Sequence, residues 1–136
     1  LPVGVLFEPE SFLATLDEDV VQTAYNQPDD RRGQKAAGQG FAAMHRAFSD
    51  LKATVVNAWG IGDRVIVEVT TTGTHDGPLG PLKATKKPVT IHFLDVLTLG
   101  KGDKITAVES YASTAELLGQ ISPPSTPAKA STPIKK

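Results

Sequence analysis

The chain has 136 residues, three scattered histidines and no cysteine, and its 14 lysines and arginines stand against 15 aspartates and glutamates. This length suits one domain with its own core, and the lack of cysteine excludes disulfide bonds, thiolate metal sites and a cysteine nucleophile. The formal net charge of −1 and the lack of a large basic cluster argue against nucleic-acid binding, and no apolar run reaches the roughly 18 residues that span a bilayer.

Two helices are predicted in the first 50 residues. Glu10–Val21 carries apolar side chains at helical spacing, and Gln34–Asp50 repeats them at positions i, i+4 and i+7. A loop is predicted between them, through residues 26–33. Each helix should therefore present one apolar stripe to a core.

Four strand-like runs follow, namely Ala53–Trp59, Arg64–Thr74, Pro88–Leu99 and Lys104–Ala112. Gly-X-Gly-Asp sequences at residues 60–63 and 100–103 separate the first two and the last two runs, which is typical of hairpins. Helices followed by an antiparallel meander predict an α+β domain over residues 1–121, with the helices on one face of a curved sheet of about four main strands.

The C-terminal part begins with a helix signal and ends in a polar tail. Ser113-Thr114-Ala115-Glu116 has the form of a capping box and predicts a short helix through Leu118. Residues 122–136 contain four prolines and little to bury, so we expect a flexible tail. We expect a soluble, cytoplasmic protein, although removal of an earlier segment stays open because Leu1 is not a methionine.

Alternation of side chains along the third run selects its inner face. The set Val89, Ile91, Phe93, Asp95, Leu97 and Leu99 is apolar except for Asp95, so this set should face the core. A hairpin that sets Leu99 opposite Ile105 also sets Phe93 opposite Tyr111 and Asp95 opposite Glu109. In that register Glu109 and Tyr111 face inward.

Asp95 and Glu109 are therefore the candidate catalytic residues. Two carboxylates side by side on an apolar face raise the pKa of at least one, as in general acid–base pairs. The alternatives are that a partner such as Arg46 or Trp59 satisfies one carboxylate, or that the strand register differs by two.

The loop Gly73-Thr74-His75-Asp76-Gly77-Pro78-Leu79-Gly80, followed by Ala84–Val89, resembles the GTH-x-G-x-x-G and x-T-G-(K/R)-x-V segments of SnoaL-type polyketide cyclases, in the nuclear-transport-factor-2-like superfamily. Gly33–Leu51 and Leu117–Gln120 are also similar, so the resemblance covers residues 12–121. It implies a conical α+β barrel around an apolar pocket and cofactor-free chemistry such as aldol cyclisation, with isomerases, dehydratases and epoxide hydrolases as distant relatives.

Two departures from the family pattern stand out. Ser113 occupies the position of the family's catalytic aspartate, and Val108 stands where a histidine is common. Serine can cap a helix but cannot act as an acid or base at neutral pH. Only about eleven residues precede Phe12, where the family has a longer first helix. We therefore expect part of the pocket's lid to be missing, to be rebuilt by this segment or to be supplied by another chain.

Several side chains are predicted to line the pocket: His45, Trp59, Phe93, Tyr111 and Ser113. For His45 a boundary position with a satisfied ring is the alternative, and His75 is expected to make hydrogen bonds within its own loop. No metal or cofactor site is predicted.

Three functions stay open at this point. The first is binding of a small apolar or polyketide-like molecule. The second is cofactor-free cyclase, isomerase or hydratase chemistry by Asp95 and Glu109, whereas an Asp-Arg-Asp epoxide hydrolase lacks its inward arginine. The third is a dimerisation or assembly module, with a homodimer expected through the outer face of the sheet.

Overall fold

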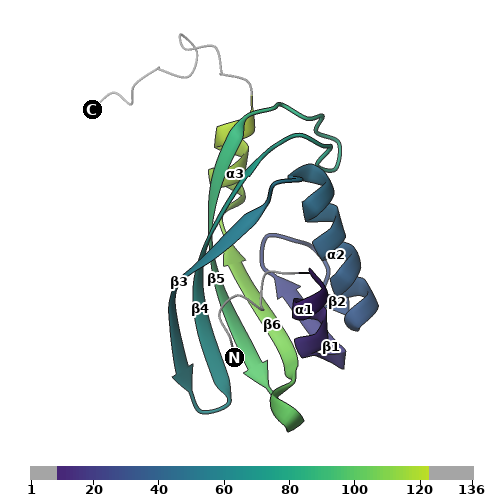
Figure 1. The fold of residues 1–136 in the computed structure, drawn as a ribbon, viewed down its shortest axis with the longest axis vertical. Coiled ribbons are helices and arrows are strands. Elements are labelled where there is room, and N and C mark those ends of the chain that lie inside the picture. The colour runs from purple at the N-terminus through teal and green to yellow at the C-terminus, as the bar shows by residue number, and fades with distance from the viewer. Residues whose placement is uncertain (1–8, 123–136) are drawn as a thin grey trace, which may run out of the picture.

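The computed structural model describes residues 9–122, which form three α-helices and six β-strands (Figure 1). In chain order these elements are α1 (Pro9–Thr15), β1 (Leu16–Ala24), β2 (Arg31–Arg32), α2 (Gln34–Ala47), β3 (Lys52–Ile61), β4 (Arg64–Thr74), β5 (Pro88–Leu99), the 3₁₀ turn η2 (Lys101–Asp103), β6 (Ile105–Ala112) and α3 (Thr114–Ile121). The predicted tail after Ser122 lies outside the described residues, as do residues 1–8.

All six strands belong to one curved sheet with the order β2-β1-β6-β5-β4-β3. Its pairings are antiparallel except for β1 with β6, which run parallel. The predicted α+β class is confirmed, and the four predicted strands correspond to β3, β4, β5 and β6. The sheet is mixed and open, however, rather than an antiparallel sheet closed into a barrel.

The predicted helix over Glu10–Val21 is wrong beyond Thr15, where the chain becomes strand β1. The buried side chains of Leu16 and Val20 are four residues apart, a spacing that fits one face of a strand as well as one face of a helix. Val20, Val21 and Thr23 are β-branched and favour the strand. Pairing with β6 supplies backbone partners that the isolated sequence does not reveal.

The core lies between the helices and one face of the sheet. Phe12 of α1 and Ala37 of α2 pack with Val67, Leu97 and Val108 of the sheet. The side chains of α3 pack with Phe48 and with the β5 residues Val89 and Ile91. The helices α1 and α2 thus cover the inner face of the sheet (Figure 1).

The register between β5 and β6 changes once, next to the turn. Leu99 lies opposite Ile105, as predicted, but the next pair is Thr98 with Ala107. One extra residue on β6 forms a β-bulge, and a slip of one residue turns every following side chain to the other face. Asp95 consequently lies opposite Ser110, and the predicted pairing of Asp95 with Glu109 is wrong.

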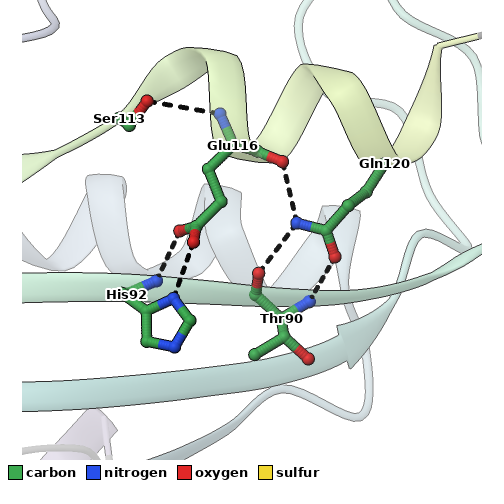
Figure 2. Close-up of polar contacts among 5 residues, drawn as sticks. All are labelled: Thr90, His92, Ser113, Glu116 and Gln120. Carbon is green, nitrogen blue, oxygen red and sulfur yellow. Dashed lines mark hydrogen bonds and ion pairs between the residues drawn. The ribbon is translucent and has the colours of Figure 1, made fainter.

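Beyond the end of β6, side chains of α3 form hydrogen bonds with the backbone of β5 (Figure 2). The Gln120 amide accepts a hydrogen bond from Thr90 N–H at 2.8 Å and donates one to the Thr90 carbonyl at 2.8 Å, as a peptide group of a neighbouring strand would. The Glu116 carboxylate accepts from His92 N–H at 2.7 Å and contacts its ring Nδ1 at 2.6 Å. These contacts hold α3 along the free edge of β5.

Ser113 caps α3, as predicted. Its hydroxyl accepts a hydrogen bond from Glu116 N–H at 3.3 Å. The return bond of a capping box is not made, because the Glu116 carboxylate is directed to His92 (Figure 2). The sequence signal therefore locates the helix start correctly, while tertiary packing redirects its acidic side chain.

The loop between β4 and β5 is tied to the end of α2. His75 is fully buried and makes the expected bonds within this loop, to Lys87 and Lys86 through its backbone and to Thr85 Oγ1 through ring Nδ1 at 2.9 Å. Gly77 N–H donates to the carbonyl of Ala47 at 3.0 Å. The loop and the helix thus meet backbone to backbone.

Replacing Gly77 with alanine is expected to destabilise the domain by more than about 3 kcal/mol, because overpacking here meets rigid backbone. A Cβ at this position would lie 1.8 Å from the carbonyl oxygen of Arg46. The matched control is Gly119→Ala in α3, where a Cβ meets nothing within 4 Å. This control should gain about 0.5 to 1 kcal/mol from helix propensity. Urea unfolding of both variants measures the difference, and equal stabilities would contradict the close contact.

Candidate functional site

A cavity of about 1050 Å³ lies between α2 and the inner face of the sheet. Its walls combine apolar side chains of α2 and the central strands with two loops, residues 26–31 and 79–82. The central wall residues are Phe41, Met44, Val67, Val69, Leu97 and Val108. This volume is at the upper end of the range for small-molecule sites. The cavity is therefore large enough for a ligand of several rings.

Asp95 is the carboxylate in the middle of the sheet wall of this cavity. It lies on β5 between Val67 of β4 and Ser110 of β6. Its Oδ1 atom is buried and has no hydrogen-bond partner. Burial raises the pKa of Asp95 to about 6, while the Ser110 hydroxyl acts in the opposite direction. The carboxyl group can therefore exchange a proton close to neutral pH.

His45 of α2 contributes a second polar atom to the same cavity. Its ring lies 5.3 Å from the ring of Phe41, and its buried Nε2 has no hydrogen-bond partner. The alternative of a boundary histidine with a satisfied ring does not hold for this nitrogen. Buried polar atoms normally have partners. Three in the described residues have none, of which Asp95 Oδ1 and His45 Nε2 belong to residues that line the cavity, whereas His75 Nε2 does not.

Other predicted pocket residues divide between the two faces of the sheet. Phe93 and Ser113 line the cavity, as does the unpredicted Ser110. Trp59 and Tyr111 do not belong to the cavity lining and are exposed on the outer face. Trp59 lies opposite Ile66 on β4, on the face away from the helices.

Glu109 also lies on the outer face, opposite Val96. Its carboxylate accepts a hydrogen bond from the Tyr25 hydroxyl at 2.8 Å, and this bond raises the pKa of Tyr25 to about 12. The Tyr25 ring stacks on Tyr111 with centroids 4.7 Å apart. Glu109 therefore bonds to the stacked tyrosine pair on the outer face of the sheet, and its carboxylate lies on the opposite face from that of Asp95.

The suggested alternatives for Asp95 are not found either. Arg46 and Trp59 are exposed and lie outside the cavity lining, and the register differs from the predicted one by one residue rather than two. The sequence did not predict Ser110 as a cavity residue, because the β-bulge turns the following side chains of β6 to the other face.

Arg31 of β2 also lines the cavity and was not predicted, because its segment has the composition of a loop. The β-branched residues of β1 could have suggested a strand with which Arg31 pairs.

Neither a metal-binding cluster nor a membrane-spanning helix is found in the described part of the chain. Among residues 9–122, no group of three or more histidine, aspartate or glutamate side chains is arranged to hold a metal ion. No helix in this same part of the chain is long and apolar enough to cross a membrane.

Structures of known proteins share this fold. A SnoaL-like protein from Jannaschia sp. CCS1 superimposes with a TM-score of 0.79 at 19% identity, with 88% of each chain covered. AclR, a proposed hydroxylase from Streptomyces galilaeus, has a TM-score of 0.71 at 20% identity and covers 82% of this chain and 81% of its own. An LEH-like epoxide hydrolase from M. tuberculosis has a TM-score of 0.62 at 17% identity, covering 83% and 76%.

Identities this low show a common fold and leave the activity open. No curated protein sequence matches the chain. The family of SnoaL-like polyketide cyclases is matched over residues 7–121, which include every described strand and helix. The curved sheet with its covering helices is the fold that those solved structures share. The chain belongs to the SnoaL-like polyketide cyclase family.

Proposed function

We propose that this domain binds a small, mostly apolar molecule in the cavity and that Asp95 exchanges a proton with it. The observation that carries the proposal is the buried, unpartnered Oδ1 of Asp95 in a mostly apolar wall, whose nearest polar neighbour is Ser110. A carboxylate in such a place costs stability unless a ligand group meets it. His45 Nε2 supplies a second contact from the opposite wall.

The supported reaction class is cofactor-free proton transfer, as in a cyclase, isomerase or hydratase. An ionised Asp95 can remove a proton from a carbon beside a carbonyl group, and the resulting enolate can close a ring or be protonated elsewhere. The proton returns to the product, so cyclisation and isomerisation consume no co-reactant, whereas a hydratase adds or releases one water molecule. A pKa of about 6 keeps most of the carboxyl ionised at pH 7 while leaving it able to return the proton.

Ligand binding can be tested with N-phenyl-1-naphthylamine, a neutral two-ring dye with an aniline arm whose fluorescence rises in apolar surroundings. We expect saturable binding to the wild-type protein. The control is Ala43→Trp, which places a large side chain on the cavity face of α2 and should abolish binding while the fold persists. Binding that survives Ala43→Trp would place the dye elsewhere and count against the cavity.

Asp95→Asn is expected to stabilise the protein at neutral pH and to leave its stability unchanged at pH 4. Between about pH 4 and 6 the folded state holds the proton more tightly than the unfolded chain, so the wild-type protein loses stability as the pH rises through this window. A folded-state pKa of about 6 against 3.8 corresponds to roughly 3 kcal/mol at pH 7. Asparagine does not titrate and avoids this loss.

Urea unfolding at pH 4, 5, 6 and 7.5 measures this difference, and carboxyl titration by NMR measures the pKa of Asp95. A variant that is less stable than the wild type at pH 7.5 would show that the carboxylate has a partner in the folded protein. The same variant should lose proton-transfer activity on any substrate while still binding the neutral dye.

We further propose that a second copy of the chain covers the outer face of the sheet. Tyr25, Trp59, Ile61, Leu94 and Tyr111 are exposed there, and the three described helices all pack on the opposite face. The face also carries both signs of charge four residues apart, on Arg64 and Glu68 of β4. A copy related by a two-fold axis can set each charge beside its opposite.

Light scattering during size exclusion is expected to give about twice the 14.4 kDa of one chain. Leu94→Glu, which puts a charge into the middle of the outer face, should shift the protein to the monomer. Leu82→Glu is the matched control, because Leu82 is equally exposed (38% against 39%) but lies in the β4–β5 loop. A wild-type monomer, or equal effects of both variants, would contradict the proposed dimer.

A further inference from the structure

Two neighbouring arginines form strand β2 and point to opposite faces of the sheet. Arg31 pairs with Gln22 and Arg32 pairs with Val21 of β1. Gln22 in turn lies opposite Val108, whose buried side chain belongs to the core. Arg31 therefore shares the inner face with Val108, and it lines the cavity together with Gln22. Arg32 faces away.

Gly40 of α2 makes room for the Arg31 side chain. A Cβ at Gly40 would lie 2.8 Å from Nε and 3.0 Å from Cζ of Arg31. One guanidinium nitrogen of Arg31 donates to the carbonyl of Ala36 at 3.4 Å. The guanidinium thus rests on the cavity face of the helix, where a larger residue would displace it.

The two arginines also differ in their charge partners. Arg32 contacts the Asp30 carboxylate at 3.7 Å, whereas Arg31 makes no salt bridge with another residue of the described range 9–122. Among the lining residues Arg31 is the one arginine or lysine. Its free N–H groups are available to a ligand, and a guanidinium fork matches the geometry of an oxyanion.

We propose that Arg31 binds a carboxylate or similar oxyanion at one end of the ligand, which is then an elongated apolar acid. This inference rests on the proposed function, in which the apolar body fills the cavity and a polar group meets Asp95. Arg31 lies in line with Leu97 across three strand spacings, and Asp95 is two residues further along β5. This offset puts the Cα atoms of Asp95 and Arg31 roughly 16 Å apart. A ligand of two or three rings with a terminal acid group spans this interval.

The acidic residues next to Arg31 make the affinity for an anionic ligand depend more strongly on Arg31. Asp29 and Asp30 directly precede β2 and also line the cavity. Asp30 has Arg32 as a charge partner, so the repulsion of a bound anion that Arg31 offsets comes mainly from Asp29. Loss of Arg31 should therefore weaken an anionic ligand much more than a neutral one of the same shape.

Two dyes of the same ring structure test this inference by fluorescence titration. They are 8-anilinonaphthalene-1-sulfonate, which carries an oxyanion, and N-phenyl-1-naphthylamine, which lacks it. Arg31→Gln should weaken binding of the sulfonate dye roughly ten-fold and leave the neutral dye unchanged. Arg32→Gln is the matched control for the loss of one positive charge. It also leaves Asp30 without its charge partner, so it should weaken the sulfonate dye much less than Arg31→Gln does, and it should leave the neutral dye unchanged.

Gly40→Ala keeps both charges and moves the Arg31 side chain, so it should also weaken the sulfonate dye selectively. Near-ultraviolet circular dichroism checks that each variant is folded. If Arg31→Gln does not fold, the two single variants Gly40→Ala and Arg31→Lys replace it in the same titrations. Equal losses for Arg31→Gln and Arg32→Gln, or no loss for either, would overturn the role of Arg31. Failure of the neutral dye to bind the wild-type protein would overturn the proposed function itself.

Discussion

The chemistry of the cavity depends on the β-bulge beside the turn between β5 and β6. Leu99 faces Ile105 before the bulge, and Thr98 faces Ala107 after it. A bulge of one residue turns the rest of its strand over, so β6 presents Ser110 to the cavity and Glu109 to the outside. Asp95 consequently has a hydroxyl neighbour instead of a second carboxylate. Its pKa is raised by burial rather than by repulsion from a like charge.

Two close contacts of α2 shape the walls of the cavity, one with the backbone of a loop and one with an arginine side chain. At Gly77 the β4–β5 loop meets the carbonyls of the last turn of α2, and at Gly40 the Arg31 side chain lies against the helix. Any side chain at either position would push the helix or its neighbour outward. Both contacts therefore determine the shape of the cavity, although neither residue carries a functional group.

The polar groups on the two faces of the sheet differ in whether they have hydrogen-bond partners. The inner face offers the unpartnered atoms of Asp95 and His45, which suit a ligand. The outer face gathers Tyr25, Glu109 and Tyr111 into a bonded and stacked cluster that leaves no buried group unsatisfied. The proposed binding and proton transfer rest on the unpaired polar atoms in the cavity wall, and the proposed association between chains rests on the exposed aromatic rings of the open sheet face.

The sequence by itself determined the family, the α+β class, the positions of α2 and of the strands β3, β4, β5 and β6, and the start of α3 at Ser113. These features rest on local signals, namely hydrophobic spacing, glycine turns and a helix cap, which act between residues close in the chain. It also identified Asp95, because a single acid in an alternating apolar strand is visible without a partner.

Only the tertiary structure decided which residues surround Asp95. The β-bulge, the parallel pairing of β1 with β6 and the placing of Arg31 on the inner face depend on contacts between distant segments. The spacing of Leu16 and Val20 fits a helix and a strand equally well, so pairing with β6 settles the choice. One inserted residue reverses a strand face without a distinct sequence signal, which is why Glu109 and Tyr111 were assigned to the cavity and Ser110 was not.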